Sequence, residues 1–524
     1  MTSTRTSAAI VVGVVVALTA CTGGAGRAPV ETATPTVTAA PTPVPVEPVV
    51  VETVLDGEVA EVEVGPLALH DDVAVLRLAA RVPYPTLMFA YSFVYESVGS
   101  PGPNGVRLVD REAGTVARAL RTEDDTIVMT RNGSPGGPAT DSAEEAAGDD
   151  VTVVYVAFPV PDAATVDVLL PATGWVPDVP VVDAADAGAL TVPPGELADG
   201  APAPEVPFAL EAYSEVLGGQ VSARRSVEQL EVVVASDVLF AFDSDQLAPE
   251  ADGALQAAVA QVTAHAEGRL TVVGHTDDQG DEAYNTDLSQ RRAATVASRI
   301  AQFADLSAFE VTVQGRGEAE PAVPGTGEAE RAQNRRVELV LETSRTSDVE
   351  QVVEVTGSLP DPQGPVAPGA TGVSVVDGDD RFDVRLDEVR RAGRHLVGGL
   401  EVTNTGSADL ALHAFSSGGR GTRGGLDPSL SYSATNVTLA VGGTRYFPAD
   451  YLTDVEDGDR EPLAERAVVG IAPGQTRLVT VVWPDPGGDT VTVEVAPRFH
   501  STISGLQTAG RAPFRLTDVT VVDG

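Results

Sequence analysis

The apolar pattern changes its period between about Leu230 and Glu342, and this change constrains the fold more than any other feature of the chain. Runs that suit strands alternate there with runs that suit helices. One helix is expected to start at Pro249 and to repeat its apolar residues every 3.6 positions. A longer helix is expected at Asp281–Phe303, and strands at Val232–Phe242, Leu270–Gly274, Phe309–Gln314 and Val337–Leu341. We therefore predict a central α/β module, ordered β-α-β-α-β-β, over residues 229–345.

The sequences on both sides of this module have a different pattern, in which short Val-rich runs alternate with Gly and Pro turns. The two flanks contain a similar stretch: Val154–Pro161 followed by Thr165–Val168 in the first, and Val479–Pro486 followed by Thr490–Val493 in the second. The aromatic residue and both prolines occupy the same positions in each stretch. Short strands at this spacing are typical of antiparallel sandwiches. We predict two related, all-β immunoglobulin-like sandwich domains at 51–185 and 372–524, joined to the module by linkers at 186–228 and 346–371.

Arg292 occupies an unusual place on the longer helix of the module. A helical wheel puts Arg292 inside the apolar stripe formed by Leu288, Val296 and Ile300, with Asn285 on the same side, whereas Arg291 faces water. An inward arginine without a counter-charge would cost several kcal/mol, so Arg292 needs a partner. Asp277, at the end of the second strand, is the nearest candidate. The pair forms either an internal salt bridge or an acid and a base that together bind a zwitterion.

The same region resembles a known family, the OmpA-like peptidoglycan-binding domain. That family's helix motif is met at Asn285, Leu288, Ser289, Arg292, Ala293, Val296 and Ile300. Further matches are Phe240-x-Phe242-Asp243 with Leu247, Gly274-His-Thr-Asp277 with Gly280, Gly315-x-Gly317 with Pro321, and Asn334-Arg-Arg-Val-Glu338. The resemblance covers about a fifth of the chain, and its motifs follow in the family's order.

This resemblance implies a non-catalytic domain that holds the diaminopimelate residue of the peptidoglycan stem peptide. By position, Asp277 would accept hydrogen bonds from the ligand's ammonium group and Arg292 would bind its carboxylate, with Asn285 and Arg335 lining the same pocket. Arg335 and Arg336 can exchange roles in this expectation. Either can also cap the acidic helix expected at Gly327–Ala332.

The N-terminus has the proportions of an export signal. An apolar run from Ala8 to Leu18 follows one charged residue, Arg5, and ends at Cys21, the sole cysteine. Leu18-Thr-Ala-Cys21 resembles a bacterial lipobox, so we expect a signal peptide at 1–20 and a lipid on Cys21. The Pro- and Thr-rich segment 21–50 is expected to be an extended tether that reaches about 80 to 90 Å.

Composition narrows the choice of function. The net charge is −42 and the chain has no lysine, so nucleic acid is not an expected partner. No catalytic motif is present, and His275 has no second histidine or cysteine at ligand spacing, so we expect neither an enzyme, nor a metal site, nor a cofactor.

We therefore predict an exported lipoprotein that is anchored on the outer face of a membrane, the outer membrane where the organism has one. Its central module binds peptidoglycan and tethers the membrane to the wall. The alternative is an envelope sensor or adhesin, in which the β-sandwich domains bind a protein or glycan and the module only positions them.

Overall fold

The computed structural model describes the chain from residue 46 onward, with gaps. Described are residues 46–55, 58–81, 103–130, 151–197, 201–216, 221–343, 361–412, 415, 433–453, 460–466, 468, 470–496, 502–503, 506–507 and 512–524. The predicted signal peptide, Cys21 and nearly all of the predicted tether lie outside these residues. Within them, no helix combines the length and the apolar character needed to cross a membrane.

The N-terminal β region has two sheets over one core. The first joins β1 (Val49–Leu55), β2 (Glu58–His70), β3 (Val73–Ala80) and β6 (Thr152–Pro159), and the second joins β4 (Arg107–Asp110), β5 (Thr115–Arg118), β7 (Thr165–Leu170) and β8 (Gly174–Asp183). Buried residues from both sheets, such as Leu76, Phe158 and Val168, form a common core.

The C-terminal β region also surrounds a core of its own, centred on Trp483, Phe382 and Phe514. The buried Trp483 donates a hydrogen bond from Nε1 to the carbonyl of Val437, at 2.7 Å. Its main strands are β15 (Val366–Pro368), β16 (Val373–Asp377), β17 (Asp380–Arg385), β18 (Glu388–Ala392), β19 (His395–Asn404), β20 (Val437–Val441), β21 (Thr444–Tyr446), β22 (Asp450–Leu452), β23 (Arg460–Pro462), β24 (Thr476–Pro484), β25 (Thr490–Val495) and β28 (Phe514–Asp523). The chain is thus mostly β outside the central module.

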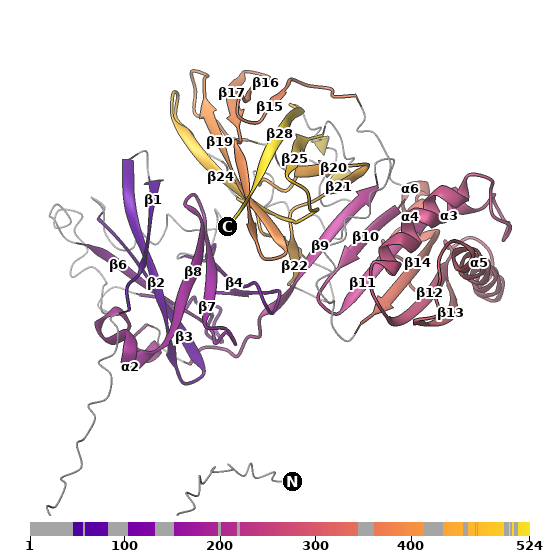
Figure 1. Cartoon of the computed structure of the whole chain (residues 1–524), viewed down its shortest axis with the longest axis horizontal. Helices are drawn as coiled ribbons and strands as arrows, with labels where there is room; N and C mark the ends of the chain where they lie inside the picture. Colours follow the sequence, from indigo (N-terminus) through magenta and orange to yellow (C-terminus); the bar gives the residue numbers. More distant parts are fainter. Residues whose placement is uncertain are drawn as a thin grey trace, which may run out of the picture. The chain divides into compact units, whose positions relative to one another are not determined.

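The central module is α/β, as predicted. Its sheet has the order β10-β11-β14-β12-β13, in which only β12 and β13 are parallel. The elements are β10 (Val221–Arg225), β11 (Gln229–Ala235), α3 (Ser236–Leu239), α4 (Ala251–Thr263), β12 (Gly268–His275), α5 (Glu282–Phe303), β13 (Phe309–Gly317), α6 (Glu328–Asn334) and β14 (Arg336–Glu342), with helices α4 and α5 packed on the sheet (Figure 1).

The first strand of the module ends earlier than predicted. We expected Val232–Phe242, but β11 stops at Ala235 and one helical turn, α3, follows. The consecutive residues Leu239 and Phe240 are both buried in the module's core. Leu239 is the last residue of α3, and Phe240 returns to an extended conformation and pairs with Leu247.

The interval predicted as the linker 186–228 contains ordered structure, which corrects that expectation. It holds α2 (Ala184–Ala187), two short 3-10 turns, β9 (Phe208–Val216) and β10. Strand β9 pairs with β5, β10, β21 and β22, and Figure 1 shows it running between the β22 and β10 labels. The predicted linker 346–371 likewise contains β15, which pairs with β28.

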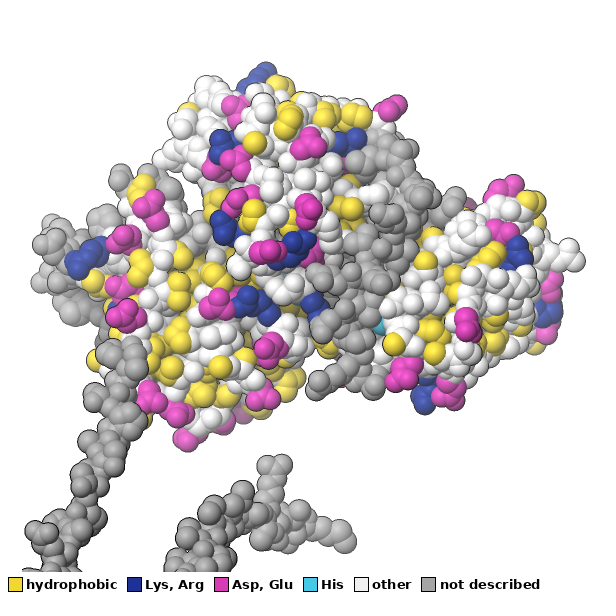
Figure 2. All heavy atoms as spheres, viewed as in Figure 1, with side chains coloured by type: hydrophobic (Ala, Val, Ile, Leu, Met, Phe, Trp, Pro, Cys, Tyr) yellow, Lys and Arg dark blue, Asp and Glu magenta, His cyan; other side chains and the backbone are white. Residues whose placement is uncertain are grey.

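Acidic side chains are spread over the surface. Figure 2 shows them scattered over the described part of the visible face, with arginines between them. The net charge of −42 therefore does not form one acidic patch on that face.

Candidate functional site

Helix α5 presents the residues that the helical wheel predicted. Asn285, Leu288, Arg292, Val296 and Ile300 are all buried. The side chain of Arg291 is 43% exposed and pairs with Asp245. The separation of the two adjacent arginines is thus confirmed.

Arg292 is buried without a carboxylate partner among the residues that the structure describes. Its Nε donates to the carbonyl of Ser244, at 2.8 Å, and its guanidinium lies 5.1 Å from the centre of the Phe240 ring. Burial lowers the pKa of Arg292, and the negative charge of Asp237 is the first of several that oppose this shift. The arginine therefore stays charged, with its remaining donors available to an anion.

Asp277 pairs with Arg335 rather than with Arg292, so the internal salt bridge left open by the sequence is not formed. Arg335 Nη1 lies 2.8 Å from Asp277 Oδ2, and the backbone N–H of Gln279 donates to Oδ1 at 3.1 Å. The Asp277 side chain keeps 12% of its surface exposed. It is both held in place and accessible.

Arg335 joins three carboxylates. It makes a two-pronged contact with Asp237, at 2.9 and 2.7 Å, in addition to Asp277, and its Nη2 lies 2.9 Å from Glu328 in the first turn of α6. These hydrogen bonds, above all those to Asp237, raise its pKa. Arg335 thus contacts both Asp277 and the acidic helix, and its role in lining a ligand pocket stays a prediction.

Arg336 has a different surrounding. Its Nε donates to Glu338 at 2.6 Å, and its other donors reach the backbone carbonyls of Asn334 and Glu320. Its side chain is therefore committed to the sheet and the adjoining loop, whereas Arg335 is the one of the two that contacts Asp277.

Asn285, on α5, contacts the turn that carries Asp277. Its Nδ2 donates to the backbone carbonyl of Asp277 at 3.3 Å and to Glu318 at 2.6 Å. The turn itself passes through Gly280, whose φ of +106° suits glycine. Asn285 therefore fixes the position of Asp277 relative to α5.

Two acidic residues of the site were missed by the sequence predictions. Asp237 lies on α3, in a stretch expected to be a strand, and nothing in its local pattern distinguishes it. Asp243 falls inside a quoted motif without an assigned role, and it accepts a hydrogen bond from the hydroxyl of Tyr284 on α5. Both depend on the turn of α3, which bends the chain back toward α5.

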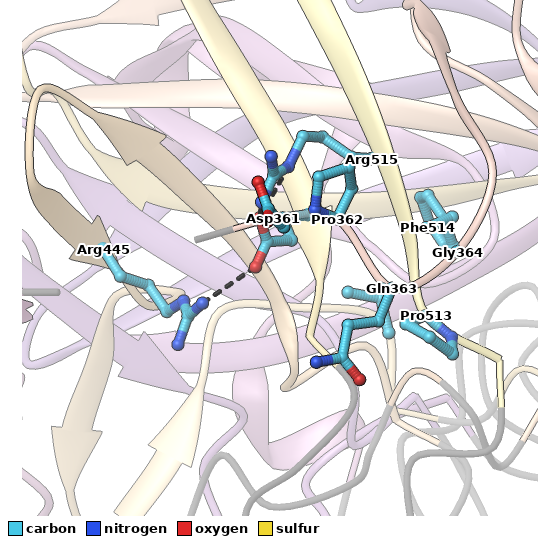
Figure 3. A pocket seen from close by; sticks show the side chains of 10 residues that line it. Asp361, Pro362, Gln363, Gly364, Arg445, Pro513, Phe514 and Arg515 are labelled. Atoms are coloured by element: carbon cyan, nitrogen blue, oxygen red, sulfur yellow. Dashed lines mark hydrogen bonds and ion pairs between the residues drawn. The ribbon is translucent and has the colours of Figure 1, made fainter. Parts of the chain in front are cut away.

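A separate polar cavity of about 70 Å³ lies in the C-terminal β region (Figure 3). Arg445 and Arg515 both contact Glu494 there, at 2.8 and 2.9 Å, and all three side chains are buried. Because these charges bind one another, the triad joins β21, β25 and β28.

The comparisons agree with the geometry of the module. Residues 239–335 match the model of the OmpA family. A peptidoglycan-associated lipoprotein of Legionella pneumophila is 39% identical over 20% of this chain, and the match spans 60% of that protein. The outer-membrane lipoprotein YfiB of Pseudomonas aeruginosa is 34% identical over 22% of this chain and 67% of its own length. The cell wall anchor of the T6SS from Pseudomonas aeruginosa is a similar solved structure, with 30% identity, a TM-score of 0.22 and coverage of 24% of this chain and 90% of that one.

Residues 239–335 of the α/β module define the class, and the match to YfiB covers two thirds of that protein. The chain belongs to the OmpA family.

Proposed function

We propose that the protein binds peptidoglycan non-covalently through this module, and that its ligand is the diaminopimelate residue of the stem peptide. The main observation in support is Arg292, a buried arginine with no carboxylate partner among the described residues, together with the partly accessible Asp277, whose negative charge acts on Arg292. Two relatives are named as a peptidoglycan-associated lipoprotein and a cell wall anchor, which favours the same ligand.

The chemistry of the site suits an amino acid side chain that ends in both charges. The donors of Arg292 that are not bound to Ser244 would grip the ligand carboxylate, a charge-assisted contact typically worth about 1.5 to 3 kcal/mol. Asp277 would accept hydrogen bonds from the ligand's ammonium group. Asn285 and Arg335 would hold Asp277 in place from two sides.

The remainder of the chain suits a tether between membrane and wall. A lipid on Cys21, after removal of residues 1–20, would anchor the protein on the outer face of a membrane, and residues 21–50 would span the gap to the folded part. Relatives named as outer-membrane lipoproteins favour this placement, in the outer membrane where there is one. No nucleic acid is expected to bind, and no catalytic step is proposed.

The two β regions would be related immunoglobulin-like domains. Phe158 of β6 and Trp483 of β24 each precede the proline that ends the strand, and both aromatic side chains are fully buried. The next main strand, β7 or β25, begins with Thr-Val in both regions. A protein or glycan partner of these domains would give them a function of their own.

A pull-down on purified sacculi tests the proposed ligand, using residues 45–524, which form one compact unit. We expect Asp277→Ala and Arg292→Ala to reduce binding at least about tenfold, since each removes a charged contact. Arg291→Ala removes an arginine from the adjacent, exposed position and should bind like the wild type. Free diaminopimelate should compete. Wild-type binding by both pocket variants would refute the assignment of the pocket.

A further inference from the structure

We propose that Asp237, on the short helix α3, makes the pocket selective for ligands that carry an ammonium as well as a carboxylate group. It does so by balancing the positive charge that Arg292 and Arg335 would otherwise offer to plain anions. This inference rests on the proposed function of the same pocket. Asp237 belongs to none of the motifs that identify the module.

Asp237 is committed to Arg335 with both of its carboxylate oxygens. Its Oδ1 lies 2.9 Å from Arg335 Nε and its Oδ2 lies 2.7 Å from Arg335 Nη2. This leaves Nη1 of Arg335 directed at Asp277. The two aspartates therefore flank a single guanidinium, and the side chain of Asp237, 56% exposed, is on its more accessible side.

Helix α3 also brings Asp237 close to Arg292. The backbone N–H of Phe240 donates to the carbonyl of Ser236, which ties the Phe240 ring to the turn that carries Asp237. The guanidinium of Arg292 lies against that ring. Of the charged groups around Arg292, Asp237 does most to oppose the lowering of its pKa by burial. One carboxylate thus acts on both arginines of the pocket.

The charge balance explains how this arrangement would select a ligand. Arg292 and Arg335 are matched by Asp237 and Asp277, with Glu328 and Asp243 adding negative charge nearby. A plain dicarboxylate would bring a surplus of negative charge and be repelled. A ligand with both groups adds no net charge to the pocket and is not repelled, which is how charge arrangement gives specificity.

Calorimetric titration of residues 45–524 with two small probes tests this role. One probe is diaminopimelate, and the other is pimelate, the dicarboxylate of the same chain length without amino groups. The wild type should prefer diaminopimelate. Asp237→Asn should raise the affinity for pimelate about three- to tenfold, because one negative charge beside the arginines is removed.

Asp252→Asn is the matched control. Asp252 also pairs with an arginine of α5, Arg299, at 2.8 Å, so the substitution changes the same charge in a similar pair away from the pocket. It should leave both affinities at the wild-type level. Thermal unfolding of each variant checks that the fold is retained.

The outcomes separate this inference from the proposed function. If Asp237→Asn weakens diaminopimelate binding without any gain for pimelate, Asp237 only holds Arg335 in place and the inference is wrong. If the wild type fails to bind diaminopimelate while Asp237→Asn gains pimelate binding, the proposed ligand is wrong and the role of Asp237 stands. Failure of both measurements would overturn both.

Discussion

Glu338, on β14, is a half-buried carboxylate whose ionisation stabilises the module. Burial alone would raise its pKa, but the contact with His275, 3.3 Å away, and the charge of Arg336 outweigh this effect and lower the pKa from 4.5 to about 2. A carboxyl group with a depressed pKa stabilises the fold above its unfolded pKa. That stabilisation, here on the order of 3 kcal/mol, is lost as the pH falls from about 4.5 through about 2.

Glu338→Gln should therefore lower the free energy of unfolding near neutral pH and flatten its decline between pH 4.5 and pH 2. Urea unfolding of residues 45–524, followed by circular dichroism at several pH values, measures this. Glu310→Gln, at a side chain 71% exposed, should keep the wild-type pH dependence. Equal pH dependence in Glu338→Gln and the wild type would show that Glu338 does not contribute.

At the scale of single residues, the sequence predicts which way a side chain faces better than it predicts which residue that side chain pairs with. The wheel placed Arg292 inward and Arg291 outward correctly because helical periodicity is local. It could not decide which group pairs with Asp277, because Arg335 lies 58 residues further along the chain and reaches Asp277 only through the packing of β14 on β12. The contact of Asp237 with Arg335 could not be predicted either, because these two residues are also far apart in the chain.

The backbone of helix α5 lies directly against the backbone of its sheet, and two glycines permit this close approach. A Cβ at Gly274 would lie 2.2 Å from the carbonyl oxygen of Ser289, and one at Gly315 would lie 2.3 Å from the backbone nitrogen of Gln290. Ser289 Oγ also accepts a hydrogen bond from the N–H of Gly317, at 2.9 Å. The glycines thereby set the height of α5 over the sheet, and with it the positions of Asn285 and Arg292.

Gly315→Ala should push α5 away from β13 and destabilise the module by about 1 to 3 kcal/mol, as overpacking does. It should also weaken sacculus binding, since Arg292 moves with the helix. Chemical denaturation and the sacculus pull-down measure the two effects. Gly253→Ala, on α4, meets no atom within 4 Å and should be neutral or stabilising. Unchanged stability in Gly315→Ala would mean that the helix has room to shift freely.

At the scale of elements, the module was largely predictable and its first strand was not. The spacing of the apolar residues predicts helix α5 and strands β12, β13 and β14, and the folded module retains these elements. The local hydrophobic pattern does not show that β11 stops at Ala235 and that a helical turn follows, although Leu239 and Phe240 both belong to the core. That turn of α3 is also the one that carries Asp237.

At the scale of the whole molecule, strand β9 lies in an interval that we expected to be a linker between domains. Leu210 on β9 belongs to a cluster with Val109, Val116 and Leu169 of the first β region and with Tyr451, Leu463 and Val482 of the second. Arg107 of β4 also donates to the hydroxyl of Tyr451 at 2.6 Å. The sequence does not reveal the role of this strand because three of its partners, β5, β21 and β22, are distant in the chain.

This shared cluster predicts that the two β regions lose stability together. Leu210→Ala removes a side chain that is 5% exposed, and core truncations of this kind cost about 2 to 5 kcal/mol. Hydrogen exchange followed by mass spectrometry should show faster opening both in β7 and in β24, since Leu169 and Val482 contact the same cluster. Val206→Ala, at a side chain 78% exposed just before β9, should change neither. Faster exchange in only one of the two strands would mean that the β regions are independent. Faster exchange in both would show that the two β regions behave as one cooperative unit through the cluster that they share.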